Sequence, residues 1–92
     1  MRALHLSDLH VAACALRGLP ETDHASAIDD AINNAKTADA YRKRLHKAHP
    51  THGPGTLSGV FGTVNEPSRC DLAYLIALKA VVAALCRDIR KN

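Results

Sequence analysis

The chain has 92 residues, of which 47% are hydrophobic and 3% aromatic, and its formal net charge is +3 with the histidines neutral. This length suits one domain with a modest core, and the composition excludes a disordered chain. The charge permits weak attraction to a polyanion without requiring it, and the few β-branched and aromatic residues argue against an all-β core.

The first helix is expected over about residues 7–17. Ser7 or Asp8 can cap its N-terminus, and apolar residues follow at helical spacing. Gly18, as a left-handed cap, and Pro20 then end it.

The second helix is expected over about residues 22–48, with Thr22 or Asp23 at its start. Acidic residues lie early in this helix and basic residues late, which is the polarity that the helix dipole favours. Pro50 keeps the preceding residue out of the helical conformation, so the helix should stop just before it. The residues expected to face inward are Ala25, Ile28, Ile32, Ala35, Ala38, Tyr41, Leu45 and Ala48.

Two further helices are expected in the C-terminal half. Thr56 can cap a short one, over about residues 56–62, after a loop rich in glycine and proline. The last, over about residues 71–90, is apolar on nearly every side, and Lys79 is the one charged residue in its long apolar run. Such a helix is normally central in a fold or shared with another subunit. The run is too short, and its lysine too central, to favour a membrane span.

These elements predict an all-α fold, a small bundle of about four helices in a single domain over residues 1–92. The apolar C-terminal helix is expected to be the central element, with the other three helices packed around it.

The cysteines and the N-terminal residues indicate the cellular compartment of the protein. Cys14, Cys70 and Cys86 are odd in number and form no C-x-x-C pair, which fits a reducing compartment better than a disulfide scaffold. The first residues, MRALHLSDLH, contain no apolar stretch of signal-peptide length. We therefore expect a cytoplasmic protein.

The segment AYRKRLHKAHPTHGPGTLSG, residues 40–59, holds four cations and three histidines and no acidic residue. Backbone amides at its glycines and at the next helix start, together with the cations, can form an anion site. The helix dipole alone could also explain the cations, and the spacing is not that of a nucleotide-binding P-loop. The residues expected to bind a partner or an anion are Arg42, Lys43, Arg44, Lys47, His49, Gly53, Gly55 and Thr56.

Metal binding and catalysis have little support in the sequence. His46, His49 and His52 are spaced three apart, and Cys70 could complete a zinc set with them, but nothing in the spacing requires it. We expect no metal and no cofactor. A nucleophile and a base could meet only through the fold, and no reaction motif is present, so we do not expect an enzyme.

The same segment resembles one found in a small family of uncharacterised alphaproteobacterial proteins of Rhodobacterales type. The positions that carry the resemblance are Tyr41, Arg42, Arg44, His49, Pro50, Gly53, Gly55, Thr56 and Leu57. Thr51 and His52 depart from it, because an arginine and an aromatic residue often occupy these positions. The resemblance implies a helical fold and the location of a site, but no activity.

Our leading hypothesis is therefore a non-enzymatic interaction module, an adaptor or regulatory protein. It would bind a macromolecular partner through the basic corner at the end of the second helix and the following loop. An alternative is a nucleic-acid-binding protein that uses phosphate contacts, and a lesser one is a small anion-binding domain. The apolar C-terminal helix also suggests a homodimer.

Overall fold

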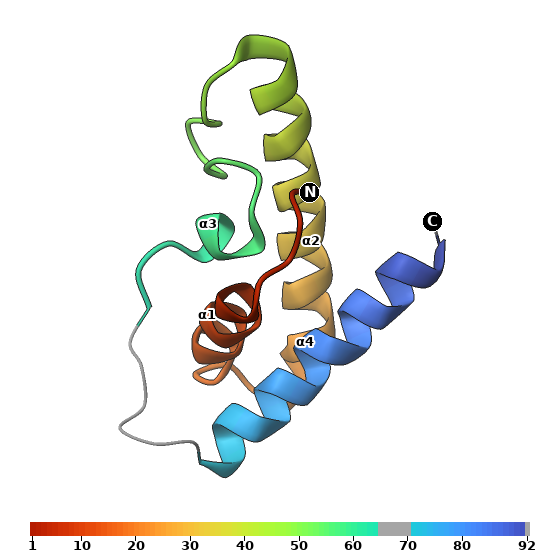
Figure 1. The fold of residues 1–92 in the computed structure, drawn as a ribbon. Helices are drawn as coiled ribbons and strands as arrows, with labels where there is room; N and C mark the ends of the chain where they lie inside the picture. The colour runs from red at the N-terminus through yellow and green to blue at the C-terminus, as the bar shows by residue number, and fades with distance from the viewer. Residues whose placement is uncertain (65–70, 92) are drawn as a thin grey trace.

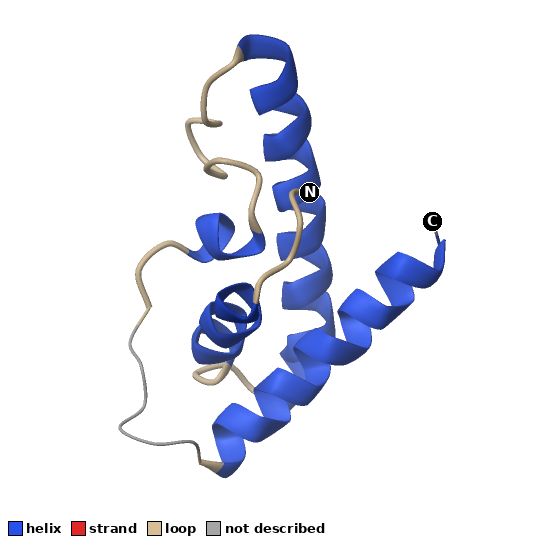
Figure 2. Cartoon of the chain, in the orientation of Figure 1, coloured by secondary structure: helices blue, strands red, loops and turns tan. Residues whose placement is uncertain are grey.

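The computed structural model describes residues 1–64 and 71–91, and within them the fold is all-α, as the sequence predicts (Figures 1 and 2). The helices are α1 (Leu6–Leu16), α2 (Glu21–Leu45), α3 (Leu57–Phe61) and α4 (Leu72–Lys91). None of the described helices has the combination of length and apolarity that crossing a membrane requires.

The longest helix is α2, and α4 crosses the half of α2 that lies nearer its N-terminus (Figure 1). Helix α1 packs against α4 and more lightly against α2, whereas α3 packs against α1 and α2. The expectation that the other three helices surround α4 is therefore wrong for α3, whose backbone does not approach α4. One buried side chain of α3, Leu57, still joins the shared core.

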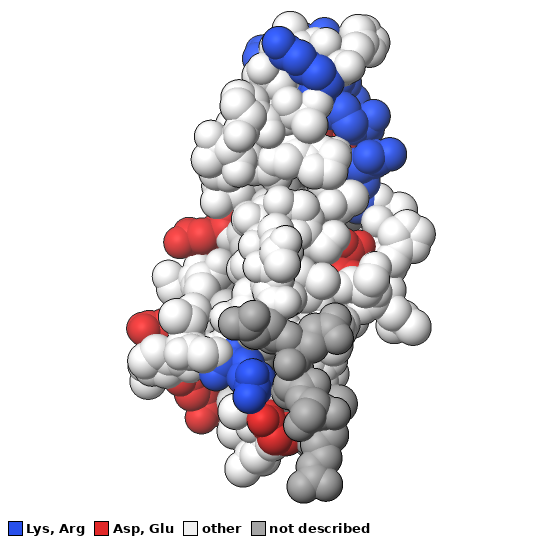
Figure 3. Space-filling model, turned by 90° about the vertical axis from the view of Figure 1, so that its left-hand side faces the viewer, with Lys and Arg blue, Asp and Glu red and all other residues white. Residues whose placement is uncertain are grey.

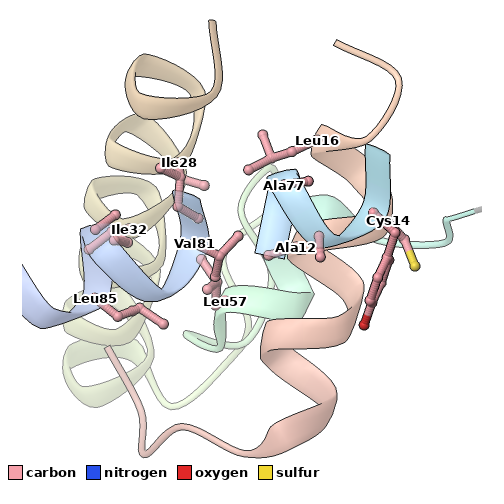
Figure 4. Packing of buried hydrophobic residues seen from close by; sticks show 13 residues of the cluster. Ala12, Cys14, Leu16, Ile28, Ile32, Leu57, Ala77, Val81 and Leu85 are labelled. Atoms are coloured by element: carbon pink, nitrogen blue, oxygen red, sulfur yellow. The ribbon is translucent and has the colours of Figure 1, made fainter. Parts of the chain in front are cut away.

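The core lies where α1, α2 and α4 meet (Figure 4), and alanine is its most frequent residue. Its buried members are Ala12, Ala13, Cys14, Leu16, Ile28, Ala31, Ile32, Leu57, Tyr74, Ala77, Val81, Ala84 and Leu85. Alanine lets helix backbones approach closely but removes little apolar area from water, so stabilisation depends on the few large side chains. The largest that are fully buried are Leu16, Ile28, Leu57 and Val81, each contributing about 1.5–3 kcal/mol.

Helix α2 ends at Leu45, three residues earlier than expected, because His46 adopts a left-handed conformation with φ of 59°. The N–H of His46 donates to the Arg42 carbonyl and closes the last turn. This end of α2 extends beyond α1 and α4 (Figure 1). Leu45 and Ala48 are consequently exposed rather than facing inward.

Two other expectations about α2 are wrong. Its N-terminal cap is Pro20 rather than Thr22 or Asp23. Ala25, expected in the inward stripe, is exposed. The buried side chains of this helix still follow the expected spacing from Ile28 to Ala38.

Helix α1 also differs from expectation at both ends. His5, rather than Ser7 or Asp8, is its N-cap, and Asp8 lies in the first turn. At the other end Arg17 is right-handed, and Gly18 does not have the positive φ of a left-handed cap. In α3 the expected cap is confirmed, because the Thr56 side chain accepts a hydrogen bond from the Gly59 N–H.

Candidate functional site: the basic end of α2

A buried carboxylate lies beneath the predicted basic corner. Asp39 is 5% exposed, although a charged side chain on a helix is ordinarily found facing water. Its Oδ1 accepts a hydrogen bond from Arg42 Nη2 at 2.8 Å, and Lys43 Nζ lies 3.4 Å from Oδ2. The Met1 amino group is 3.7 Å from the same Oδ2. One carboxylate therefore faces three cationic groups, and this end of the molecule keeps a positive excess.

Gly55 explains how Asp39 becomes buried. It has φ of +95°, and a Cβ added to it would lie 2.8 Å from the Asp39 Cα and 2.9 Å from the Asp39 Cβ. Its carbonyl accepts the Arg2 N–H at 2.8 Å. The loop after α2 thus folds back onto the helix through a residue without a side chain, and the N-terminal segment covers the same place.

His49 organises the loop between α2 and α3. Its Nδ1 accepts the N–H groups of Thr51 and His52, both at 3.1 Å, so a neutral ring would carry its proton on Nε2. Backbone groups of His49 and Gly53 exchange two hydrogen bonds, and the His49 ring packs edge-on against Tyr41. The N–H groups of His49, Thr51, His52 and Gly53 are therefore all hydrogen-bonded within the loop.

Backbone N–H groups at the start of α3 are also hydrogen-bonded by side chains of the same protein. Asp8 Oδ1 accepts the Ser58 N–H at 3.0 Å, while its Oδ2 accepts the His5 N–H at 2.9 Å. Asp8 is 2% exposed, so this carboxylate joins the first turns of α1 and α3 inside the protein. The Thr56 hydroxyl accepts the next amide, that of Gly59, at 3.0 Å. The chain's own oxygens thus occupy the positions at which an anion would meet these amides.

The predicted site residues accordingly separate into two groups. His49, Gly53, Gly55 and Thr56 build the loop and its contact with α2, as the preceding distances show. The cations lie on the surface, and Figure 3 shows Lys and Arg gathered at the upper end of the molecule, where α2 ends. An open depression at this end is lined by Arg42, Lys43, His46, Lys47 and Ala48.

The cations differ in how far they are neutralised. Arg42 is paired with Asp39 and its side chain is 34% exposed, whereas that of Lys43 is 69% exposed. In the part of the chain that the structure describes, Arg44 and Lys47 form no ion pair. Leu45, which was expected to face inward, is exposed and lies next to Arg44 in the sequence.

Among the residues that the structure describes, three carboxylates have lowered pKa values. The Arg42 hydrogen bond is the main cause at Asp39, where it lowers the pKa against the opposing effect of burial. At Asp8 burial alone would raise the pKa, but hydrogen bonds from His5 and Ser58 together bring it below its usual range. At Asp71 the N–H of Tyr74 is the main cause of a lowered pKa.

These shifts predict a loss of stability in acid. Each carboxylate has a lower pKa folded than unfolded, so its contribution is complete above the unfolded value of ~3.9 and is lost as the pH falls through the folded value. We expect the midpoint of urea unfolding to decrease between about pH 5 and pH 2. Asp39→Asn should make this decrease shallower, whereas Asp30→Asn, on an exposed part of α2, should not. If wild type and Asp39→Asn lose stability at the same rate as the pH falls, the Asp39 carboxylate does not contribute to the acid sensitivity and this prediction is wrong.

The histidines do not assemble into a metal site in the described residues, where no group of three or more His, Cys, Asp or Glu side chains could hold an ion. The rings of His49 and His52 stack with centroids 4.8 Å apart, whereas His46 caps α2. Cys70, considered as a further ligand, lies outside the described residues.

One cysteine–histidine contact was not foreseen. Cys14 Sγ lies 3.6 Å from His10 Nε2, and His10 Nδ1 is 2.8 Å from Tyr74 Oη, so the three side chains connect α1 to α4. The i, i+4 spacing in HVAAC was the available signal, because residues four apart share a helix face. Cys14 is 7% exposed, so its sulfur is largely shielded from solvent.

Comparison with known proteins places the chain in a family. A family model described as a domain of unknown function, DUF7742, matches residues 2–85. No curated protein and no solved structure matches the chain. The match covers both the helical core and the basic end, and it confirms the expectation of an uncharacterised family. The chain belongs to the DUF7742 family.

Proposed function

We propose that this protein is a non-enzymatic interaction module that binds an acidic surface of a partner protein through the basic end of α2. The observation that carries the proposal is the exposed group of cations, with the exposed Leu45 beside them in the sequence, at an end of α2 that the other helices leave free. Cations in the last turn of a helix interact favourably with its dipole. That interaction does not explain why this end of α2 extends beyond the core.

Charge supports an anionic partner. One carboxylate, that of Asp39, faces three cationic groups, and Arg44 and Lys47 add two more that are not paired among the described residues. Because the neighbouring loop amides are hydrogen-bonded within the protein, side chains rather than backbone would make the contacts. This favours carboxylates held on a partner surface over a small anion enclosed by amides.

The exposed leucine favours protein over nucleic acid as the partner. Leu45 is 45% exposed and lies between Arg44 and His46 in the sequence. Protein interfaces combine apolar contacts at their centre with charged groups around them, whereas contacts to a phosphate backbone are made by cations and polar groups. Self-association through α4 is compatible with this role, because α4 crosses α2 away from its basic end (Figure 1).

Binding of a defined acidic probe tests the proposal. We expect a short fluorescent peptide of glutamates flanking two leucines to bind in anisotropy titrations, with affinity falling as salt is added. Arg44→Glu with Lys47→Glu should weaken binding by about tenfold or more at low salt, equivalent to ~1.4 kcal/mol. Leu45→Ser should also weaken it, by a smaller factor.

The matched control is Arg90→Glu with Lys91→Glu, which makes the same change of charge at the end of α4 and should leave peptide binding unchanged. Duplex and single-stranded DNA serve as competing probes. If DNA binds more tightly than the peptide and Leu45→Ser has no effect on either, the partner is a nucleic acid and the proposal is wrong. If neither probe binds at low salt, the cations only stabilise the end of α2 and the proposal is wrong.

A further inference from the structure

Helix α4 carries a second apolar face that the fold leaves uncovered. Its buried face is formed by Tyr74, Ala77, Val81, Ala84 and Leu85. The other face contains Leu72, 72% exposed, Leu75, 52%, Val82, 42%, and Ile89, 62%. With Lys79 and Cys86, both exposed, these residues form one stripe, which we call the outer stripe: Leu72, Leu75, Lys79, Val82, Cys86 and Ile89.

The spacing of the outer stripe is that of a coiled-coil seam. Successive members are three, four, three, four and three residues apart, as at the a and d positions of a heptad. A seam of this period stays against a second helix of the same kind along its whole length. An amphipathic helix that only needs to cover its own core has no use for this second stripe, since its core-facing residues already do so.

We propose that a second copy of this chain docks on the outer stripe, with the two α4 helices antiparallel. The charges decide the direction. In a parallel pair Lys79 would face Lys79 of the partner subunit, and the cationic C-terminal ends with Arg90 and Lys91 would lie together. In an antiparallel pair centred on the stripe, Lys79 faces Val82 of the partner subunit, and its charge can extend to water.

Antiparallel pairing also brings unlike ends together. The end of α4 that carries Arg90 and Lys91 comes beside the end of the partner helix that begins after Asp71. In the same register, Leu72 lies opposite Ile89 of the partner subunit, and Leu75 opposite Cys86 of the partner subunit.

The size of the stripe sets the strength of the dimer. From Leu72 to Ile89, eighteen residues, the helix rises about 26 Å, and a helix is ~10–12 Å across, so the patch is on the order of 300 Å² per subunit. That is at the size at which apolar patches on monomers begin to be functional, but below the ~800 Å² per partner of a standard interface. We therefore expect a weak, reversible dimer whose fraction rises with protein concentration. This inference goes beyond the proposed function, with which self-association through α4 is compatible.

Sedimentation of the full chain tests the interface. Wild type should shift from monomer to dimer as its concentration rises, and Leu75→Glu should remain monomeric throughout, with its helical circular dichroism retained because the side chain is half exposed. Leu6→Glu, which changes an exposed leucine of α1, should dimerise as wild type does. A wild type that stays monomeric at the highest concentration overturns the proposal, and so does a dimer that Leu75→Glu does not weaken.

Disulfide trapping tests the direction. In a Cys70→Ser background, Leu75→Cys should give a covalent dimer on treatment with diamide, because position 75 lies opposite Cys86 of the partner subunit. The Cys70→Ser chain alone should not, since antiparallel pairing separates the two copies of Cys86, and Cys14 is buried. Covalent dimer from Cys70→Ser alone, without Leu75→Cys, would indicate parallel pairing and overturn the antiparallel assignment.

The two proposals can fail separately. Arg44→Glu with Lys47→Glu should abolish peptide binding and leave the dimer intact. Leu75→Glu should abolish the dimer and leave each monomer able to bind the acidic peptide. Loss of both properties in either variant would contradict the separation of the two surfaces.

Discussion

Gly55→Ala is expected to lower the free energy of unfolding by ~2–4 kcal/mol, which combines the cost of a strained backbone with that of an overpacked contact. The added methyl group would meet the Asp39 Cα at 2.8 Å, a backbone atom in the middle of α2 that cannot turn aside. The residue must also keep φ near +95°, which an L-residue with a side chain rarely adopts. For a domain of this size the melting temperature should fall by roughly 10–20 °C.

Two other glycines separate these causes. Gly62 has φ of +67° but open space around it, so Gly62→Ala measures the backbone strain alone. Gly18 has neither a positive φ nor a neighbour within 4 Å, so Gly18→Ala should be close to neutral. Thermal unfolding should therefore rank the variants with Gly55→Ala least stable. A Gly55→Ala protein as stable as Gly62→Ala would show that the loop does not pack closely on α2.

Asp8→Ala is the second substitution with a large expected effect, a decrease of ~2–4 kcal/mol in the free energy of unfolding. It removes the acceptor of two backbone N–H groups, those of His5 and Ser58, and an unsatisfied buried donor costs about 1–3 kcal/mol. Chemical denaturation of the folded chain measures the loss. Asp8→Asn should cost nearly as much, because an amide of the same size has one acceptor oxygen and its NH₂ group would face an N–H donor.

Asp30→Asn makes the same chemical change at an exposed position of α2 and should alter stability by less than about 0.5 kcal/mol. The Asp8 variants should also loosen α3, whose first turn depends on that carboxylate. Hydrogen exchange at the Ser58 amide should then accelerate relative to amides in the middle of α2. An Asp8→Ala protein with unchanged stability would mean that water replaces the carboxylate at no cost.

Much of the fold could be predicted because it depends on local chemistry. The spacing of Ile28 and Ile32 gave the buried face of α2, and Thr56 gave the cap of α3, since both signals act between residues close in sequence. The early end of α2 could not be predicted, because Pro50 allows any stop before it and a histidine in the left-handed conformation has no sequence signature.

The candidate site could be predicted only in part. The cations at the end of α2 are evident in the sequence, since they follow one another in the chain. The partners of the amides beyond them are not, because the Ser58 amide is satisfied by Asp8, which lies fifty residues earlier. The burial of Asp39 depends on Gly55 and on the N-terminal segment folding over it.

The sequence by itself determined that this protein is helical, where its helices lie to within a few residues, and that one end of α2 is basic. Periodicity, capping residues and dipole preference act within a few residues of each other, so no tertiary information is needed. Only the tertiary structure decided which face of α4 is buried, because a helix that is apolar on nearly every side contains no signal that selects one. It also decided that Asp8 and Asp39 lie inside and Leu45 outside, because these depend on contacts between segments far apart in the chain.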